Sequence, residues 1–193
     1  MLNLKNYNII LASGSPRRRD FFKSLHIDFT VDVRKTDETY PAHFQGSEIT
    51  EFIAKVKATE FHDLKENDIL ITSDTIVWFE NQALGKPKNF DEARQILSRL
   101  SGKTHEVITS VCFTTKDFQK TISDTTKVWF KNLTEDEIEF YINTYKPFDK
   151  AGSYGIQEWI GLIGVEKIEG SYFNVMGLPA HLIYKILSEE FSS

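Results

Sequence analysis

The first stretch that could do chemistry is an arginine run behind a Ser-Gly-Ser loop, in NIILASGSPRRRDFF. On a helix that begins at Pro16, the apolar stripe is Phe21, Phe22 and Leu25, and Arg18 falls in the middle of that stripe. An arginine on a core face costs free energy unless an anion meets it, and the first turn offers free N–H groups. The pattern therefore predicts a phosphate clamp of Arg17 and Arg18, with Arg19 facing water. An internal ion pair or a solvated basic turn is the alternative.

A carboxylate follows the next apolar run, in ILITSDTIV. Ile69–Ser73 is predicted to be a buried strand that ends at Asp74. A carboxylate at such a strand tip can hold Mg²⁺ or Mn²⁺ and accept a proton from water. The alternative is a turn cap, which Asp often supplies. Thr75 adds a hydroxyl before apolar residues resume, so the polar pair interrupts sheet material, which favours a functional role.

Two lysines and a loop glutamate can complete a polyphosphate site. Lys57 lies at the edge of the apolar stripe of its predicted helix, whereas an isolated lysine there would usually only snorkel to water. Lys86 in LGKPK has a stiff, extended setting and is a second candidate phosphate contact. Glu38 is a candidate second metal ligand, with simple solvation as the alternative. The five histidines show no metal-ligand spacing. The arginines, the lysines and the carboxylates together predict metal-assisted polyphosphate chemistry.

Composition limits the classes of protein to which the chain can belong. Its 193 residues predict a single domain, residues 1–193, with room for two lobes. A net charge of −5 argues against a broad nucleic-acid or anionic-membrane surface. The only cysteine, Cys112, excludes an internal disulfide and fits a reducing compartment. Since no apolar run is long enough for a membrane span or a signal peptide, we expect a cytoplasmic protein without membrane partners.

The elements that must position these residues alternate between strand and helix patterns, which predicts an α/β fold around a mixed sheet. The predicted strands are Asn8–Ala12, Ile27–Val33, Ile69–Ser73, Glu106–Thr115, Thr121–Phe130 and Leu162–Ile168, with a hairpin joining Thr75–Phe79 to Ala83–Leu84. The predicted helices are Pro16–His26 behind a Ser15 cap, Ser47–Leu64, Asn89–Leu100, Thr134–Tyr145 behind a capping box, and a last one from Pro179.

Six motifs together resemble one family. LASGSPRR, SDTIV, LGKPK, LSGKTHEV, AGSYGIQ and IEGSYFNVMGLP occur in the order and spacing of the Maf proteins, which are nucleoside-triphosphate pyrophosphatases. The resemblance covers residues 9–187. It implies an elongated α/β fold with a deep central cleft, similar to inosine triphosphatases, and an assembly that is often dimeric. It also implies metal-dependent cleavage between the α- and β-phosphates of a nucleoside triphosphate.

The resemblance also suggests roles for particular residues. Asp74 looks like the family's general base, and Arg17, Thr75 and Gln157 look like the positions that separate its substrate classes. Positions linked to phosphate or metal fall on Ser13, Arg18, Glu38, Lys57 and Lys86. The three class-separating residues match the pyrimidine-specific members, which implies dTTP and UTP as substrates, with modified pyrimidines a further expectation. The amide of Gln157 can pair with both N3–H and O4 of uracil or thymine.

The sequence departs from the family pattern at two places, and two other functions are alternatives. Trp78 replaces a small aliphatic residue, and Glu158-Trp159 stands where many members continue with Gly-Leu-Gly. A nucleotide-binding regulator without turnover is one alternative function, although the intact Asp74 argues against it. A nucleic-acid-binding module that uses SPRRR as a basic grip is the other, although the acidic balance disfavours it.

Overall fold

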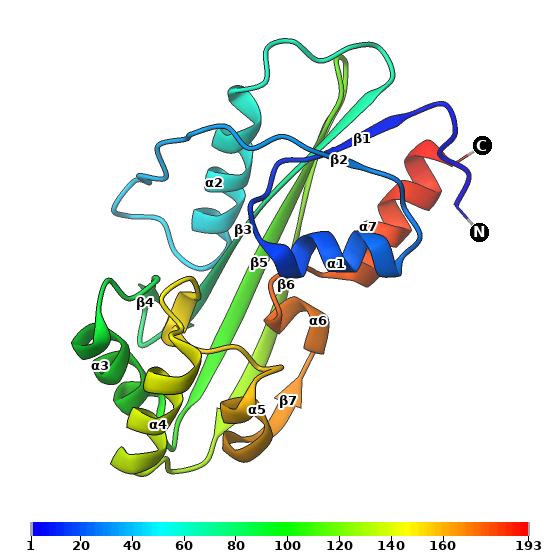
Figure 1. Cartoon of the computed structure of the whole chain (residues 1–193). Helices are drawn as coiled ribbons and strands as arrows, with labels where there is room; N and C mark the ends of the chain where they lie inside the picture. Colours follow the sequence, from blue (N-terminus) through cyan, green and yellow to red (C-terminus); the bar gives the residue numbers. More distant parts are fainter. Residues whose placement is uncertain (1, 193) are drawn as a thin grey trace. The chain divides into compact units, whose positions relative to one another are not determined.

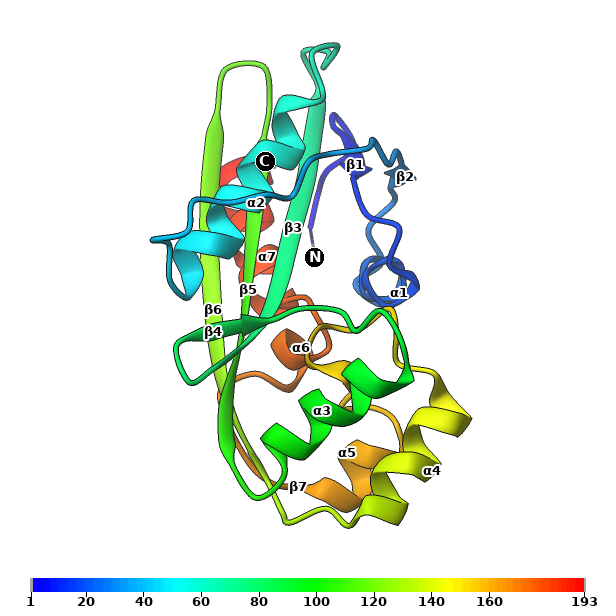
Figure 2. The same cartoon turned by 90° about the vertical axis from the view of Figure 1, so that its left-hand side faces the viewer.

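A mixed sheet of seven strands, flanked by helices, runs through the part of the chain that the computed structural model describes, residues 2–192 (Figures 1 and 2). The strand order is β2-β1-β3-β5-β6-β7, and β4 pairs with β3. β1 runs parallel to β2 and β3, whereas the β3–β4 and β6–β7 pairs are antiparallel. The strands are β1 (Asn8–Leu11), β2 (Thr30–Val31), β3 (Asp68–Phe79), β4 (Gln82–Leu84), β5 (Thr104–Thr114), β6 (Gln119–Phe130) and β7 (Val165–Glu169). The predicted α/β class with a mixed sheet is confirmed.

The chain divides into two compact units, and three long strands contribute residues to both. The first unit comprises Met1–Asp74, Thr109–Asp124 and Gly177–Ser193. The second comprises Thr75–Ile108 and Thr125–Met176. The division cuts β3 between Asp74 and Thr75, so each unit receives one residue of the polar pair.

The first unit holds α1 (Pro16–Ser24), α2 (Ser47–Thr59), α7 (Ala180–Ile186) and a π-helical end at Leu187–Phe191. Phe22 on α1, Ile49 on α2 and Ile71 on β3 are almost fully buried. Each such side chain stabilises the fold by about 1.5–3 kcal/mol when it leaves water. The apolar stripes predicted for these helices therefore do face a core.

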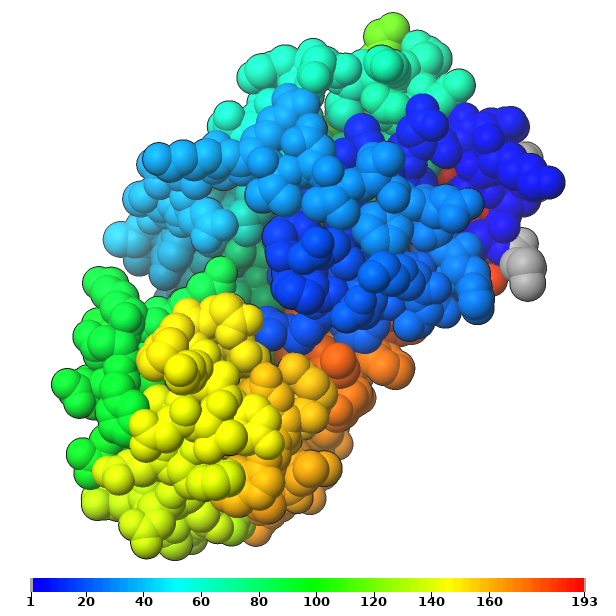
Figure 3. Space-filling model, in the orientation of Figure 1, coloured from blue at the N-terminus to red at the C-terminus, as the bar shows by residue number. Residues whose placement is uncertain are grey.

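The second unit holds α3 (Phe90–Leu100), α4 (Glu135–Tyr145), a 3-10 turn (Ala151–Ser153), α5 (Trp159–Gly164) and α6 (Tyr172–Val175). Figure 3 shows α3 and α4 side by side on its surface. Leu97, Tyr141 and Val128 belong to one buried cluster between these helices and the strands. No helix among residues 2–192 combines the length and the apolar character needed to cross a bilayer.

Local chemistry explains why several elements form where the sequence predicts them. The Asn89 side chain accepts a hydrogen bond from the Glu92 N–H and caps α3. Thr134 and Glu137 form the predicted capping box at the start of α4. The predicted β3–β4 hairpin is confirmed, and its two turn residues, Glu80 and Asn81, have φ of 50° and 59°. Two consecutive left-handed residues are typical of the tight turn that suits a twisted hairpin.

Three strand predictions are wrong in their extent. β3 does not end at Asp74 but continues to Phe79, because the branched and aromatic residues after Thr75 favour strand as strongly as those before. The strand predicted over Ile27–Val33 is only Thr30–Val31. Within the strand predicted over Leu162–Ile168, α5 takes the residues up to Gly164, and β7 begins at Val165.

Two helix predictions also need correction. α2 ends at Thr59 rather than Leu64. Ser15 does occupy the cap position of α1 in extended conformation, but its side chain makes no capping hydrogen bond. Its backbone N–H instead donates to Ser13 Oγ at 3.3 Å, so the loop is held by a short turn rather than by the predicted cap.

Candidate functional site

The ammonium of Lys57 is the centre of a charged cluster in the first unit. Lys57 Nζ lies 2.9 Å from Asp74 Oδ1 and 2.9 Å from Glu38 Oε1, and it also donates to the Ser73 carbonyl oxygen at 3.3 Å. Lys57 comes from the last turn of α2, Asp74 from the middle of β3, and Glu38 from the loop before α2. The carboxylates of Asp74 and Glu38 therefore meet at the ammonium of Lys57, although the three residues come from separate parts of the sequence.

Arg18 lies beside this cluster. Its Nε donates to the Gly177 carbonyl oxygen at 2.9 Å, and its Nη1 donates to the Ser73 carbonyl oxygen at 3.2 Å and to Ser13 Oγ at 3.5 Å. These acceptors explain how an arginine on the core face of α1 is tolerated. Burial lowers the pKa of Arg18 from its ordinary value, while the carboxylate of Asp74 opposes that shift.

Asp74 is mostly buried, with 13% of its side chain exposed. Burial raises the pKa of this carboxyl, and the nearby charges of Lys57 and Arg18 partly offset that rise. Because the effect of burial outweighs that of the two cations, the carboxylate of Asp74 is a stronger base than a free one, as expected of a general base.

Arg17, Arg19 and Ser13 are the neighbours of Arg18 at the start of α1. Arg17 is half-buried and adds a positive charge next to Arg18. Arg19 is half-buried as well, and its Nη2 donates to the Gly14 carbonyl oxygen at 3.3 Å in an exposed hydrogen bond. Ser13 is buried, and its hydroxyl contacts Arg18. The first unit thus brings together six predicted residues: Ser13, Arg17, Arg18, Glu38, Lys57 and Asp74.

The second unit carries the other three predicted residues. Thr75 follows Asp74 within β3 and is half-buried. Lys86 is exposed in the segment after β4, where the neighbouring Gly85 carbonyl oxygen accepts a hydrogen bond from Gly152 N–H at 3.2 Å. That bond joins the Lys86 segment to the AGSYGIQ segment. Gln157 is half-buried, and its Oε1 is shielded from water without a hydrogen-bond partner among the described residues.

Sequence analysis missed the residues that hold the AGSYGIQ segment. His105 lies in β5, where its Nε2 pairs with Tyr154 Oη at 2.7 Å. Glu158 pairs with Lys150 and Tyr141. The only signal in the sequence was the unusual Glu158 itself, because partners 8 and 17 residues away follow no local pattern.

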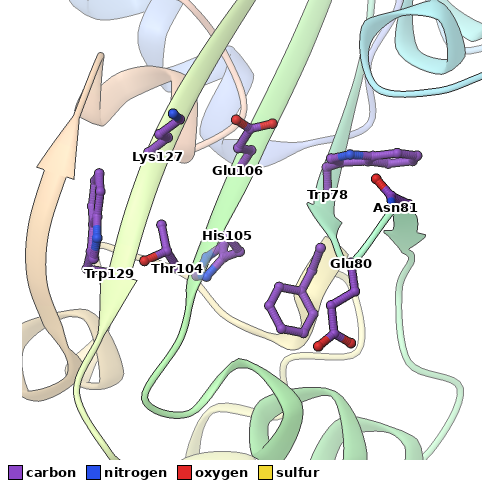
Figure 4. Close-up of a pocket in the computed structure, with 9 residues that line it drawn as sticks. Trp78, Glu80, Asn81, Thr104, His105, Glu106, Lys127 and Trp129 are labelled. Atoms are coloured by element: carbon purple, nitrogen blue, oxygen red, sulfur yellow. The ribbon is translucent and has the colours of Figure 1, made fainter.

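A separate hollow of about 460 Å³ lies in the second unit (Figure 4). Trp78 of β3 and Trp129 of β6 stand on its two sides, with Glu106 and Lys127 between them. Trp78, the first family departure, therefore belongs to this hollow. Trp159, the second, packs edge-to-face on Phe140 with ring centroids 4.8 Å apart.

The donor chemistry around Lys57 suits a divalent cation. Asp74 and Glu38 present carboxylate oxygens to the same positive charge, and Mg²⁺ is commonly bound by one or two carboxylates together with substrate phosphates. No group of three or more His, Cys, Asp or Glu side chains with metal-site geometry occurs in the part of the chain that the structure describes. The pair therefore fits a metal that is shared with a phosphate substrate, rather than an all-protein cage.

The sequence matches known proteins over nearly its whole length. A family model described as Maf-like protein matches residues 8–190. A dTTP/UTP pyrophosphatase of Christiangramia forsetii is 60% identical over 191 residues, which cover 98% of this chain and 97% of that protein. A protein of the same name from Bacteroides fragilis is 50% identical over 98% of this chain and 99% of its own length.

Among solved structures, a HAM1 protein from Coxiella burnetii matches with a TM-score of 0.52 and 15% sequence identity, over 95% of this chain and 99% of that one. At that identity the likeness shows a shared fold alone. The family model and the full-length relatives show the family as well as the fold, since their matches span the charged cluster around Lys57 and the segment of Gln157. The chain therefore belongs to the Maf family.

Proposed function

We propose that this chain is a nucleoside-triphosphate pyrophosphatase that hydrolyses dTTP and UTP to the nucleoside monophosphate and pyrophosphate. The observation that carries the proposal is the Lys57 cluster, in which one ammonium contacts both Asp74 and Glu38. The dTTP/UTP pyrophosphatases that match nearly the whole chain supply the substrate class.

In this mechanism Asp74 orients a water molecule toward the α-phosphorus and accepts its proton. The partly desolvated carboxylate, with its raised pKa, is suited to that role. No covalent nucleophile is needed, since positioning and charge stabilisation carry phosphoryl-type transfer. A Mg²⁺ or Mn²⁺ ion, when bound, would be held by Asp74 and Glu38 and would neutralise charge on the phosphate oxygens.

Five side chains bind the triphosphate in this proposal: Ser13, Arg17, Arg18, Lys57 and Lys86. The guanidinium of Arg18 is already fixed by three acceptors, so it needs little reordering to meet a phosphate. Its charge and that of Lys57 stabilise the negative charge that grows on the departing pyrophosphate.

Base selection is proposed to depend on Gln157, with Thr75 and Arg17 as the other class-separating residues. The side-chain amide of Gln157 can accept from N3–H of uracil or thymine through its oxygen and donate to O4 through its N–H. In the structure its Oε1 has no hydrogen-bond partner among the described residues. Cytosine presents the reverse pattern. A site built for one pattern rejects the other because buried polar groups would be left unpaired.

We further propose that the two units act as one catalytic domain, residues 1–193, and that the protein works in the cytoplasm as a homodimer. The buried, unpaired Cys112 supports a reducing compartment. The specificity pattern extends the proposal to modified pyrimidine triphosphates, which share the N3–H and O4 edge.

A substrate panel tests the function. Canonical and modified triphosphates are incubated with the protein and Mg²⁺ or Mn²⁺, and both pyrophosphate and monophosphate are quantified. We expect equal amounts of the two products from dTTP and UTP, and little from CTP or purine nucleotides. Binding of dTTP without turnover would instead support a regulator, and salt-dependent binding of an oligonucleotide without turnover would support a nucleic-acid module.

A further inference from the structure

We propose that Glu158 is a positioning residue for base selection: held by Tyr141 and Lys150, it fixes the turn that presents the amide of Gln157. This inference rests on the proposed function, because it assumes that Gln157 reads the base. It assigns a role to a residue at which this chain departs from the family pattern.

Both carboxylate oxygens of Glu158 have partners. Tyr141 Oη donates to Oε2, and Lys150 Nζ lies 3.1 Å from Oε1. Tyr141 is fully buried, and only 9% of the Lys150 side chain and 18% of the Glu158 side chain are exposed. A paired carboxylate with so little exposure cannot rotate freely without leaving buried groups unsatisfied.

The same tyrosine also holds the backbone on the other side of Gln157. Gly155 N–H donates to Tyr141 Oη at 3.0 Å, and Glu158 N–H donates to the Gly155 carbonyl oxygen at 3.0 Å. One hydroxyl thus ties Gly155 to the Glu158 side chain and closes a ring around the turn. Gln157 lies within that ring, so its backbone position depends on it.

Packing within the turn also places the amide of Gln157. A Cβ atom built on Gly155 would lie 2.9 Å from Gln157 Nε2 and 2.9 Å from Glu158 Cδ. The Gln157 amide therefore lies directly over Gly155, next to the carboxylate group of Glu158. If Glu158 is lost, the amide can move into the space that its side chain leaves.

The start of the segment is held independently. Tyr154 Oη pairs with the buried His105, and Gly152, at φ +68°, packs so closely that an added Cβ would lie 2.5 Å from Val77 Cγ2. Removal of Glu158 should therefore loosen the turn around Gln157 while the rest of the segment stays in place. The expected consequence is lost selectivity rather than lost folding.

Three variants test the inference through the ratio of kcat/KM for dTTP to that for CTP. We expect Glu158→Ala and Tyr141→Phe to lower this ratio about tenfold, mainly through dTTP, while CTP turnover stays at its low value. Glu158→Gln should keep most of the ratio, since its amide oxygen can still accept from Tyr141. Glu137→Gln is the matched control. Glu137 lies in α4, the helix that carries Tyr141, and its ion pair with Lys131 at 2.7 Å is remote in sequence from Gln157. Loss of this ion pair should leave the ratio unchanged.

Gln157→Ala separates the inference from the proposed function. If it abolishes selectivity and the double variant Gln157→Ala/Glu158→Ala is no worse, Glu158 acts through Gln157 and the inference is supported. If Gln157→Ala abolishes selectivity but folded Glu158→Ala and Tyr141→Phe keep it, the inference is overturned and the proposed function stands. If Gln157→Ala keeps the ratio, the base-reading role itself fails. Should Glu158→Ala not fold, Tyr141→Phe decides the question alone.

Discussion

At the scale of single residues, the site is a set of charges that depend on one another. Lys57 contacts two carboxylates at once, and Arg18 is held beside them by backbone carbonyl oxygens of Ser73 and Gly177. Buried charges persist only where such partners exist. Each member therefore has both a chemical role and an electrostatic one, and substitutions should be chosen to separate the two.

Asp74→Asn should lower kcat for pyrophosphate release from dTTP by at least about 100-fold, because the amide cannot accept a proton from water. The shape of the side chain is kept, so the far-ultraviolet circular dichroism spectrum and much of the nucleotide affinity should be retained. Release of pyrophosphate and calorimetric binding of dTTP are measured on the same preparation. Full turnover by the variant would remove Asp74 from the role of general base.

Lys57→Met should lower kcat/KM for dTTP by roughly 10²–10³-fold, since it removes a preorganised cation from the site of developing charge. Lys55→Met is the matched control, because Lys55 is exposed on the same helix α2. Steady-state kinetics of the two variants should differ by that factor. Equal activities would remove Lys57 from the residues that stabilise the departing pyrophosphate.

At the scale of elements, local chemistry was the most predictable part of the molecule. The Thr134 capping box and the β3–β4 hairpin follow from residues three to seven positions apart, and both form as expected. The extent of β3 was not predictable from Asp74, because a single polar residue cannot end a strand when branched residues on both sides favour it. α5 was missed because its short apolar run reads equally well as a strand.

The grouping of the site residues could be predicted only in part. The motifs singled out Glu38, Lys57 and Asp74, but their meeting at one ammonium is a property of the folded first unit. Lys150 and Tyr141 were invisible to the sequence, since each gains its role from Glu158 at a distance along the chain. Local patterns identify candidate residues, whereas tertiary pairing assigns their partners.

The cap of α4 gives a prediction at this scale. Thr134→Ala should lower the free energy of unfolding by about 1 kcal/mol, because the side chain that accepts from Glu137 N–H is lost. Thr144→Ala, at an exposed position of the same helix, should cost nothing measurable. Urea unfolding of the two variants provides the comparison. Equal stabilities would mean that the capping box contributes no net stability.

At the scale of the whole molecule, the nine predicted site residues are shared between two units. Six of them lie in the first unit and three in the second, and the chain passes from one unit to the other between Asp74 and Thr75. The hydrolytic group and a class-separating group are therefore consecutive residues of β3. Global unfolding should therefore abolish hydrolysis and substrate selection together.

Global stability should depend on pH through His105. Burial lowers its pKa from 6.5 to about 3, so the folded protein keeps a neutral imidazole while the unfolded chain takes up a proton below 6.5. The contribution of neutral His105 to the free energy of unfolding is fully present above pH 6.5. It is lost as the pH falls toward 3, by up to about 1.4 kcal/mol per pH unit.

His105→Gln should flatten that decline in the unfolding free energy between pH 7 and pH 5, even if the variant is less stable at neutral pH. His62→Gln, at an exposed histidine, should keep the wild-type slope. Chemical unfolding at several pH values measures both slopes. Identical slopes for all three proteins would show that His105 does not carry the pH dependence.

The Lys57 cluster also bears on how a polyanion approaches. Two carboxylates, Asp74 and Glu38, oppose three cations, Lys57, Arg18 and the neighbouring Arg17, so the cations are largely neutralised, and the chain as a whole carries −5. Long-range attraction of a nucleotide should accordingly be weak, and capture should rely on short-range contact. Added monovalent salt should then leave KM for dTTP nearly unchanged, whereas a steep increase would reveal electrostatic guidance from elsewhere on the surface.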